Sequence, residues 1–392
     1  MKRTVAVLFG GRSLEHDVSV VSGLQILHAL DPGAYSPMPV YIDHDSRWWI
    51  GDELWREACF KGGGPDRSGL TEVSLSPGFG SSDLMSVDEG PRVTAHRWHV
   101  DVFVPVLHGT FGEDGCIQGL LDFGGCAYVG CGVTASAIGM NKRLTKVLAA
   151  QAGVPVLPGV SCDRSVLDRD RGWMERLSRE VEDAFGWPVI VKPCNLGSSA
   201  GVSVATSSQE LVLGVMKVFQ YDLEAVIEPF IRHRLEINVA VAGLDGPVAS
   251  VTEMPLTLEE SPLTFQEKYK RHGRKSVGSA TGMAGALRVL DPQDVPADMR
   301  TNAQEYATRV FSTLGCEGIS RIDFLIDADK NDLYFNEINT LPGSMAFYLW
   351  SAAPRYWTIT ELLSRLILRA ERVQAIRRGL QRRPTADLSL LG

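Results

Sequence analysis

The first forty residues alternate between continuous apolar runs and a segment with helical periodicity. Val5–Phe9 is an unbroken apolar run closed by Gly10 and Gly11, which predicts a strand buried on both faces. Residues 15–30 carry apolar side chains at helical spacing, and Pro37–Tyr41 is a second strand candidate. A strand, a helix and a strand in this order indicate a parallel α/β unit.

Residues 43–98 interrupt this pattern with glycines, prolines, scattered tryptophans and several charges. We interpret the stretch as an insertion with a loose segment near residues 61–90. Beyond it, the pattern predicts a buried strand over Val102–Leu107, a polar loop over 108–115 and a helix over Cys116–Phe123.

The rest of the chain continues the alternation. Helices are predicted over 134–152, with Thr134 as candidate N-cap, over the charged segment 163–185, and from near Thr358 onward. The predicted strands are Val189–Lys192, Val202–Ala205, Val226–Glu228, Glu236–Ala242, Ile319–Asp327 and Leu333–Thr340. Residues 258–285 are polar and glycine-rich and predict a mobile loop, and the basic stretch from about 377 predicts a frayed tail.

Composition narrows the class of protein. The chain has 392 residues with 39 basic and 47 acidic side chains, and the net charge of −8 argues against a nucleic-acid partner. The sequence has seven cysteines, an odd number, and no C-x-x-C pair, which argues against a disulfide scaffold or a structural zinc site. We expect reduced thiols, buried as small hydrophobic side chains, in a cytoplasmic protein. No apolar stretch approaches the roughly 18 residues of a membrane span, so no membrane partner is expected.

The last predicted hairpin carries the strongest local chemical signal. Because side chains alternate along a strand, Arg321 and Asp323 share one face, and Glu337 and Asn339 share one face. A turn centred near residue 330 would place Asp323 opposite Glu337 and Arg321 opposite Asn339.

Two opposed carboxylates repel each other unless a cation lies between them. With the Asn339 carbonyl added, the ligand set is all oxygen, which suits Mg²⁺ or Mn²⁺. The alternative is a solvated face on which Arg321 neutralises the acids.

Lys192 and the turn that follows it carry the second signal. A lysine at the end of an apolar strand precedes the glycine- and serine-rich segment 195–201, which is typical of a flexible lid over phosphates. A plain surface β-turn is the competing interpretation. The P-loop pattern is absent from the sequence. Gly130–Ala135 fits a dinucleotide fingerprint, but prolines occupy the region where its acidic partner would stand.

His108 follows a predicted strand, where open α/β sheets place ligands, and Glu15 stands at the start of a predicted helix. His108 begins the loop 108–115, and Glu15 lies just beyond Gly10 and Gly11. Each also has a structural interpretation, as a loop histidine without a role and as a first-turn acid favoured by the helix dipole.

Taken together, these segments resemble the D-alanine–D-alanine ligases of the ATP-grasp superfamily. The resemblance runs in order over most of the chain, through AVLFGGRSLEHDVS (6–19), HGTFGEDGCIQGLL (108–121), YVGCGVTASAIGMNK (128–142), VIVKPCNLGSSAGV (189–202), VIEPFI (226–231), LEINVAV (235–241), EKY (267–269), GISRIDF (318–324) and NEINTLPG (336–343).

The resemblance implies an α/β fold with an α+β ATP-binding part and ATP held between two antiparallel sheets. The implied domains are an N-terminal substrate domain over 1–127, which includes the insertion 43–98, a central ATP-grasp domain over 128–227, and a C-terminal ATP-grasp domain over 228–376 that carries metal and catalytic residues. A tail over 377–392 lies outside the resemblance.

The same resemblance implies the cofactor site. Lys142 and Lys192 would bind ATP phosphates, and Glu236 would bind the ribose hydroxyls. Glu228, Phe230 and Ile231 would lie along the adenine through backbone groups and packing. Asp323, Glu337 and Asn339 would hold two Mg²⁺ (or Mn²⁺) ions, in agreement with the hairpin register.

The implied reaction joins two D-alanines for peptidoglycan synthesis through an acyl phosphate. Glu15 would bind the ammonium of the first D-alanine in a latch with Ser198 and Tyr269, and His108 would line that site. Lys268 would reach the transferring phosphate. Arg321 and the Gly343 N–H would stabilise the tetrahedral oxyanion. The family also implies small amino-acid substrates and a homodimer.

The segment after Gly343 departs from the family pattern. Many members have a serine that helps to bind the second substrate's carboxylate, and this chain has Tyr348 there, followed by Leu349. A tyrosine hydroxyl can still donate to a carboxylate. The alternatives are therefore a related ATP-grasp ligase that uses another amino acid or acceptor, a non-catalytic nucleotide-binding module, and a dinucleotide oxidoreductase based on Gly130–Ala135.

Overall fold

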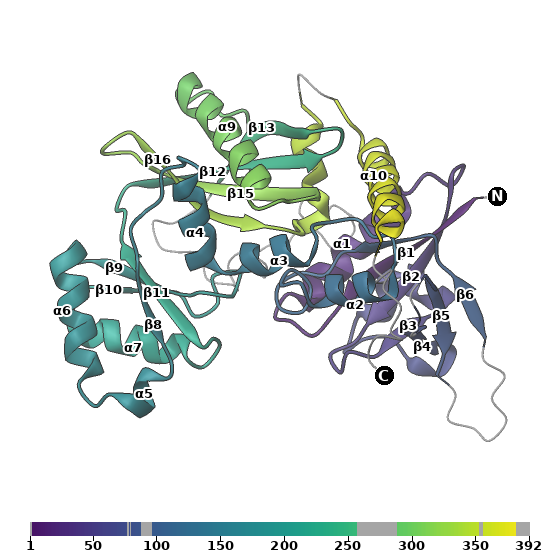
Figure 1. The fold of residues 1–392 in the computed structure, drawn as a ribbon, viewed down its shortest axis with the longest axis horizontal. Helices are drawn as coiled ribbons and strands as arrows, with labels where there is room; N and C mark the ends of the chain where they lie inside the picture. Colours follow the sequence, from purple (N-terminus) through teal and green to yellow (C-terminus); the bar gives the residue numbers. More distant parts are fainter. Residues whose placement is uncertain are drawn as a thin grey trace, which may run out of the picture.

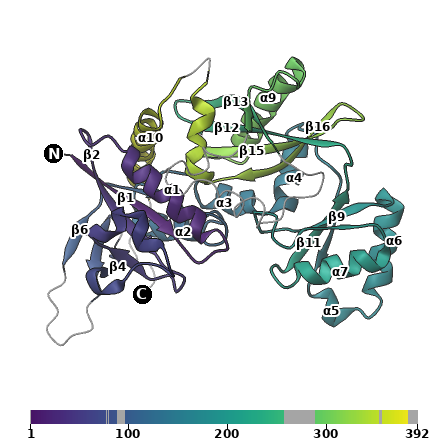
Figure 2. The same ribbon diagram turned by 180° about the vertical axis from the view of Figure 1, so that it is seen from behind.

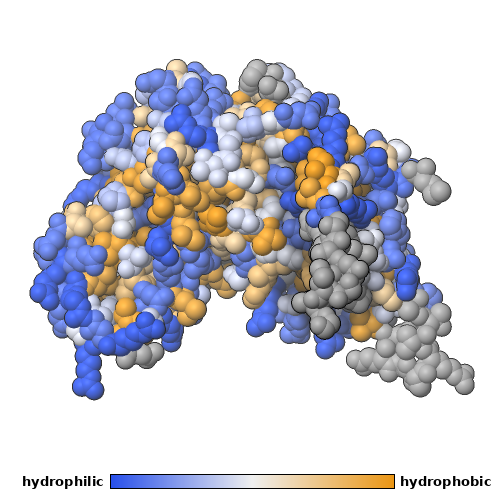
Figure 3. Space-filling model, in the orientation of Figure 1, coloured by the Kyte–Doolittle hydropathy of each residue, from blue (hydrophilic) through white to orange (hydrophobic). Residues whose placement is uncertain are grey.

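The strands form three sheets in the part of the chain that this computed structural model describes, residues 2–76, 78, 80–87, 96–256, 288–352 and 356–381. A seven-stranded sheet comes from the N-terminal third, a four-stranded sheet from the middle and a five-stranded sheet from the C-terminal part. Figure 1 shows the first two at opposite ends of the molecule, joined by the third. In the space-filling view the surface is hollowed between the two ends (Figure 3).

The N-terminal sheet begins with the predicted α/β unit. β1 (Arg3–Gly10) pairs in parallel with β2 (Tyr35–Ile42) on one side and with β7 (Val102–Pro105) on the other, and α1 (His16–Ala29) connects β1 to β2. The five apolar residues Val5–Phe9 have no exposed surface. The burial on both faces explains the unbroken apolar run.

The described residues of the segment 43–98 contribute to four strands. β3 (Trp48–Ile50), β4 (Thr71–Leu75), β5 (Asp83–Ser86) and β6 (Arg97–His99) extend the same sheet as an antiparallel meander. The prediction of a loose segment at 61–90 was therefore wrong for β4 and β5, because Val73 and Leu84 are buried in a cluster with Trp48. Short 3-10 turns η1 (Asp52–Trp55), η2 (Glu57–Phe60) and η3 (Arg67–Gly69) lie between β3 and β4.

Three helices connect the N-terminal sheet to the middle of the chain. α2 (Cys116–Gly124) lies where predicted, whereas the helix expected over 134–152 is two helices, α3 (Val133–Met140) and α4 (Lys142–Gln151). Asn141 separates them because its backbone is extended, and its side chain accepts a hydrogen bond from the Leu144 N–H. Thr134 lies inside α3, so its assignment as N-cap was wrong.

The four-stranded sheet has the order β10 (Ser203–Ala205), β9 (Val189–Pro193), β11 (Glu224–Pro229) and β8 (Val160–Asp163). Its neighbours are antiparallel. α5 (Val166–Arg169), α6 (Trp173–Phe185) and α7 (Ser208–Val218) belong to the same part of the chain. Side chains of α6 and α7 share a buried cluster with β9 and β11. This packing accounts for the helices predicted in the charged segment 163–185.

The five-stranded sheet has the order β14 (Arg288–Leu290), β13 (Pro247–Pro255), β12 (Arg234–Gly243), β15 (Gly318–Asp327) and β16 (Asp332–Asn339). All neighbouring strands are antiparallel. α9 (Ala297–Thr313) covers one face, and its buried side chains join those of β12 and β15. On the opposite face of β12, Glu236 and Asn238 are polar, whereas Ala240 and Ala242 pack in the buried cluster that contains β1.

The end of the described chain returns to its beginning. After η6 (Gly343–Trp350), α10 (Ile359–Gly379) begins near Thr358, as predicted, and Thr358 is its N-cap in a capping box with Glu361. Leu362, Leu363 and Leu366 of α10 belong to the buried cluster that contains the β1 side chains. Figures 1 and 2 both show α10 beside α1. No described helix combines the length and apolar character that crossing a membrane requires.

Candidate active site

The hairpin of β15 and β16 has the register that the sequence predicted. Asp323 pairs with Glu337 and Arg321 pairs with Asn339, and a bulge follows Asp323. Asp323 is 2 % exposed. Its two carboxylate oxygens accept hydrogen bonds of 2.7 Å from Nε and Nη2 of Arg321, and Oδ2 accepts a third of 3.0 Å from Asn339 Nδ2.

A row of polar side chains continues from this hairpin across the sheet. Asn238 of β12 pairs with Asp323, and Glu236 lies two residues earlier on the same strand and therefore on the same face. Burial raises the pKa of Asp323, the carboxylates of Glu236 and Glu337 raise it further, and Arg321 opposes them. Negative charge is thus crowded at this face.

The crowded oxygens fit a divalent cation by their chemistry. Asp323, Glu337 and Asn339 offer carboxylate and amide oxygens, which are the ligands that Mg²⁺ and Mn²⁺ prefer. Only two of these three donors are acidic, since the third is the amide of Asn339. The described residues contain no group of three or more histidine, cysteine, aspartate or glutamate side chains that could hold a metal ion.

Three lysines converge on two carboxylates beside this row. Lys142 Nζ lies 3.0 Å from Glu337 Oε2 and donates to the Leu196 carbonyl at 2.5 Å. Lys192 Nζ donates to Glu228 Oε2 at 2.8 Å and to Asn336 Oδ1 at 3.2 Å. Lys146 pairs with the other oxygen of Glu228. Three ammonium groups against two carboxylates leave one positive charge, which suits an anionic phosphate.

Glu228 is the anchor of this lysine group. It has no exposed surface, and burial alone would raise its pKa, but Lys146 and Lys192 outweigh burial and lower the pKa to about 2. Burial also lowers the pKa of Lys146 to about 8. The sequence predicted Glu228 only as a backbone neighbour of adenine, and it missed Lys146. The spacing of Lys142 and Lys146, which puts both on one face of α4, was an available signal.

The other residues predicted beside the nucleotide lie at the start of the five-stranded sheet. The Phe230 N–H donates to the Pro188 carbonyl at 3.2 Å, and the Arg234 guanidinium lies 5.5 Å from the Phe230 ring centroid. Ile231 is buried and Glu236 is half-buried. Their roles toward adenine and ribose stay predictions.

The glycine- and serine-rich turn contacts the N-terminal part of the chain. Ser198 Oγ donates a hydrogen bond to Glu15 Oε1. A side chain at Gly109 would meet the other Glu15 oxygen, since an added Cβ would lie 2.7 Å from Oε2, and the Gly109 φ of +73° also favours glycine. Glu15 and Ser198, which are 183 residues apart, therefore contact each other, and the role of this contact as a substrate latch stays a prediction. Tyr269, the third predicted member of the latch, and Lys268, which was predicted to reach the transferring phosphate, lie outside the described residues.

His108 is buried against the segment before Gly343. Its Nδ1 lies 2.9 Å from the Leu341 carbonyl oxygen, and its Nε2 lies 3.3 Å from Ser22 Oγ. Burial lowers the pKa of His108, which favours the neutral ring.

Glu113 holds the same segment from the loop that carries His108. Its carboxylate accepts hydrogen bonds from the Gly109 N–H at 2.9 Å and from the Leu341 N–H at 3.1 Å. Burial, reinforced by Glu15, raises its pKa to about 8. The sequence analysis missed this residue, although it stands in the loop 108–115.

The predicted second-substrate residues lie in η6. Tyr348 is 6 % exposed and Leu349 is fully buried. The Arg288 guanidinium carbon lies 3.7 Å from the Tyr348 ring centroid, and Arg288 Nη1 lies 2.8 Å from Glu253 Oε2. The Tyr348 hydroxyl donates to the other Glu253 oxygen at 3.4 Å. Arg288 and Glu253 had no signal in the sequence, because neither stands in a motif.

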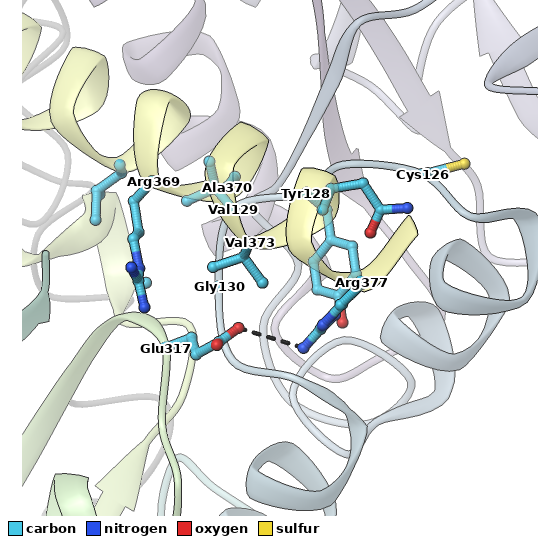
Figure 4. Close-up of a pocket in the computed structure, with 12 residues that line it drawn as sticks. Cys126, Tyr128, Val129, Gly130, Glu317, Arg369, Ala370, Val373 and Arg377 are labelled. Carbon is cyan, nitrogen blue, oxygen red and sulfur yellow. Dashed lines mark hydrogen bonds and ion pairs between the residues drawn. The ribbon is translucent and has the colours of Figure 1, made fainter. Parts of the chain in front are cut away.

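One pocket joins several of these groups. It is lined by Glu113, Gly139, Met140, Lys142, Leu196, Gly197, Glu337, Ile338, Asn339 and Thr340. The pocket therefore brings together a predicted phosphate lysine, two predicted metal ligands and the turn after Lys192. Another pocket lies between α10 and residues 126–130 (Figure 4). There Arg377 Nη2 lies 3.3 Å from Glu317 Oε2.

This architecture defines a class. Two antiparallel sheets, one carrying Lys192 and Glu228 and the other carrying the acidic hairpin, are joined to an open α/β sheet. That is the arrangement of an ATP-grasp ligase.

Comparison with known proteins gives the family. A model described as "D-ala D-ala ligase N-terminus" matches residues 4–131, and one described as "D-ala D-ala ligase C-terminus" matches residues 148–368. The D-alanine–D-alanine ligase of Heliobacterium modesticaldum is 39 % identical over 374 residues, which cover 94 % of each chain. The chain belongs to the D-alanine–D-alanine ligase family, and this sets aside the dinucleotide-oxidoreductase interpretation.

Solved structures agree with the fold. The D-alanine–D-alanine ligase from Coxiella burnetii superposes with a TM-score of 0.77 at 28 % identity, covering 96 % of each chain. VanG, a D-Ala:D-Ser ligase from Enterococcus faecalis, superposes with a TM-score of 0.73 at 24 % identity, covering 94 % of this chain and 100 % of its own. The second likeness supports the fold alone.

We expect Glu228→Gln to lower the free energy of unfolding by about 3–5 kcal/mol, because it leaves Lys146 and Lys192 buried without a full counter-charge. Urea unfolding at neutral pH measures this. Glu224→Gln on the same strand is the matched control, since the side chain of its partner Arg143 is 46 % exposed, and it should cost about 1 kcal/mol or less. Equal losses for the two variants would show that the buried group is not an anchor.

Proposed function

We propose that the protein is an ATP-dependent ligase that joins two D-alanines to D-alanyl-D-alanine, with ADP and phosphate as the other products. The observation that carries the proposal is the pocket in which Lys142, Glu337, Asn339 and residues 196–197 meet. It puts groups suited to phosphate beside groups suited to a divalent cation. The family membership and the Glu15–Ser198 contact support the amino-acid substrate.

In this proposal ATP lies between the four-stranded and five-stranded sheets. Lys142 and Lys192 bind its phosphates, and their carboxylate partners hold the two ammonium groups in place. Glu236 binds the ribose, and Glu228, Phe230 and Ile231 lie along the adenine. Asp323, Glu337 and Asn339 hold two Mg²⁺ or Mn²⁺ ions, which supply positive charge against the phosphate oxygens when bound.

The first D-alanine is held by its ammonium group at Glu15, with Ser198 and Tyr269 in the latch and His108 along the site. Its carboxylate oxygen attacks the terminal phosphorus of ATP, the bond to the bridging oxygen breaks, and an acyl phosphate and ADP result. Lys268 stabilises the transferred phosphoryl group. Exclusion of water by the turn 195–201 protects this reactive intermediate from hydrolysis.

The amine of the second D-alanine then attacks the acyl carbon. The Arg321 guanidinium and the Gly343 N–H stabilise the oxyanion of the tetrahedral intermediate, the C–O bond to phosphate breaks, and the amine nitrogen loses a proton. Tyr348 redirects its hydroxyl from Glu253 to the acceptor's carboxylate when that substrate binds, and the buried Leu349 follows it in the chain.

A second candidate is a ligase of the same mechanism with a different acceptor. The Tyr348–Arg288–Glu253 cluster favours it, because a stacked guanidinium and a phenol fill the position proposed for the acceptor. The activation of the first substrate is the same in both candidates.

The remaining parts of the proposal concern organisation. We assign the substrate domain to 1–127, the central ATP-grasp domain to 128–227 and the C-terminal ATP-grasp domain to 228–376, with α10 packed back on the first. The protein acts as a homodimer in the cytoplasm and supplies the dipeptide for peptidoglycan synthesis.

Phosphate release with ATP, Mg²⁺ and single or paired amino acids, with products identified by mass, tests the proposal. Release with D-alanine alone and formation of the dipeptide supports the first candidate. Release only when another acceptor is present supports the second. No release with any amino acid contradicts both.

Glu337→Gln should lower turnover by at least about 100-fold, because the metal-binding face loses a negative charge. Coupled ADP detection at saturating ATP measures this. Asp332→Asn is the control on the same strand, at its exposed end, and should retain turnover. Near-normal activity of Glu337→Gln would contradict the metal assignment.

Tyr348→Ser should change the relative kcat/KM among acceptors by about tenfold, because it removes the ring under Arg288 and opens space. Competition between acceptors with mass detection measures the change. The control is Tyr356→Ser, which alters a tyrosine that is 71 % exposed. The same acceptor profile in all three proteins would mean that the acceptor binds elsewhere.

A further inference from the structure

The turn after Gly343 is held by two side chains of α1 that belong to no motif quoted for the active site. Ser22 Oγ accepts a hydrogen bond of 3.2 Å from the Ser344 N–H, and Gln25 Oε1 accepts one of 2.7 Å from the Ser344 hydroxyl. Ser22 is 1 % exposed and Ser344 is fully buried. These bonds connect the N-terminal sheet to a segment more than 300 residues away.

The proton positions in this cluster follow from the partners of His108. Its Nδ1 lies 2.9 Å from the Leu341 carbonyl, which can only accept, so Nδ1 carries the proton. In the neutral ring Nε2 is then an acceptor, and the Ser22 hydroxyl 3.3 Å away donates to it. Ser22 therefore donates to His108 and accepts from Ser344, and the segment 341–344 is bridged at both ends.

The bridged segment leads into a strained turn. Ser344, Met345 and Ala346 have φ values of 52°, 54° and 46°, although none of them is glycine. Left-handed backbone is disfavoured for such residues and occurs singly rather than in runs. It persists where the surroundings determine it, and here the surroundings include the hydrogen bonds from α1.

The turn lies directly between two groups of the proposed reaction. Gly343 precedes it and offers the N–H to the oxyanion, and Tyr348 follows it at the acceptor position. A displacement of the turn would move both groups at once, and small displacements of catalytic groups lower rates strongly.

We propose that Ser22 and Gln25 are positioning residues that hold the left-handed turn 344–346, with His108 as the link to Leu341, and so set the geometry of the Gly343 N–H and of Tyr348. The catalytic part of this inference rests on the function proposed above. The structural part rests on the hydrogen bonds alone.

Ser22→Ala is the test, and Ser19→Ala is the matched control. Ser19 lies on the same helix, is fully buried, donates to the Val106 carbonyl at 2.6 Å and accepts from the Gly10 N–H at 2.8 Å. Both variants lose one buried hydroxyl, but only Ser22 contacts the turn. Amide hydrogen exchange over residues 341–350 and steady-state kinetics with ATP and D-alanine are measured for each.

We expect Ser22→Ala to speed exchange in 341–350 about tenfold and to lower kcat about tenfold, with the KM for ATP within about twofold of the parent protein. Ser19→Ala should leave the exchange of 341–350 unchanged. Gln25→Met, which removes the acceptor and keeps the chain length, should act like Ser22→Ala in a smaller degree, and it replaces that variant if Ser22→Ala does not fold.

Unchanged exchange over 341–350 in Ser22→Ala and Gln25→Met, or an equal rise in Ser19→Ala, would overturn the inference. So would faster exchange with an unchanged kcat in an active enzyme. If the parent protein forms no dipeptide, the proposed function fails, and the exchange measurement alone still decides whether α1 holds the turn.

Discussion

The part of the molecule proposed to bind the nucleotide depends on one carboxylate, Glu228, that stays ionised although it is shielded from water. Glu228 has no exposed surface, and it keeps its charge because Lys146 and Lys192 contact its two oxygens. The three residues come from α4, β11 and β9, so their ion pairs fix a helix to the central sheet. Buried charges of this kind cost free energy when a partner is lost. Lys192 is therefore held at a defined place by Glu228 before any ligand binds, and Lys142 is held by Glu337 and the Leu196 carbonyl.

The candidate site is assembled from segments that are distant in the chain. Glu15 stands directly before α1, Ser198 lies in the turn after β9, and the acidic row comes from β12, β15 and β16. Each contributes a charged or polar group to the space between rigid sheets. Because the groups come from separate sheets, the distance between the sheets determines the distances between these groups.

The parts predicted well from sequence are those in which neighbours in space are also neighbours in sequence. The register of Asp323 with Glu337 follows from one short turn. The burial of Val5–Phe9 on both faces follows from the unbroken apolar run itself. Pairing between distant segments left no such signal. The meander of β4 and β5 looked loose because its order comes from packing around Trp48. The Thr134 cap was wrong because α3 already begins at Val133, with Gly132 as its N-cap. Ser22 contacts Ser344, and Arg288 contacts Tyr348, only because the fold brings these distant residues together, so neither could be singled out from the sequence.

The packing of α10 on the N-terminal sheet also bears on how the protein is made. Leu362, Leu363 and Leu366 complete the buried cluster around β1, which leaves the ribosome long before α10 does. Contacts of such sequence separation form late, because the whole intervening chain must be in place first. The apolar side chains of β1 and α1 are therefore fully buried only after α10, the last described helix, has packed on them. During translation this surface is open to chaperones, and truncation before α10 would leave it exposed in the released chain.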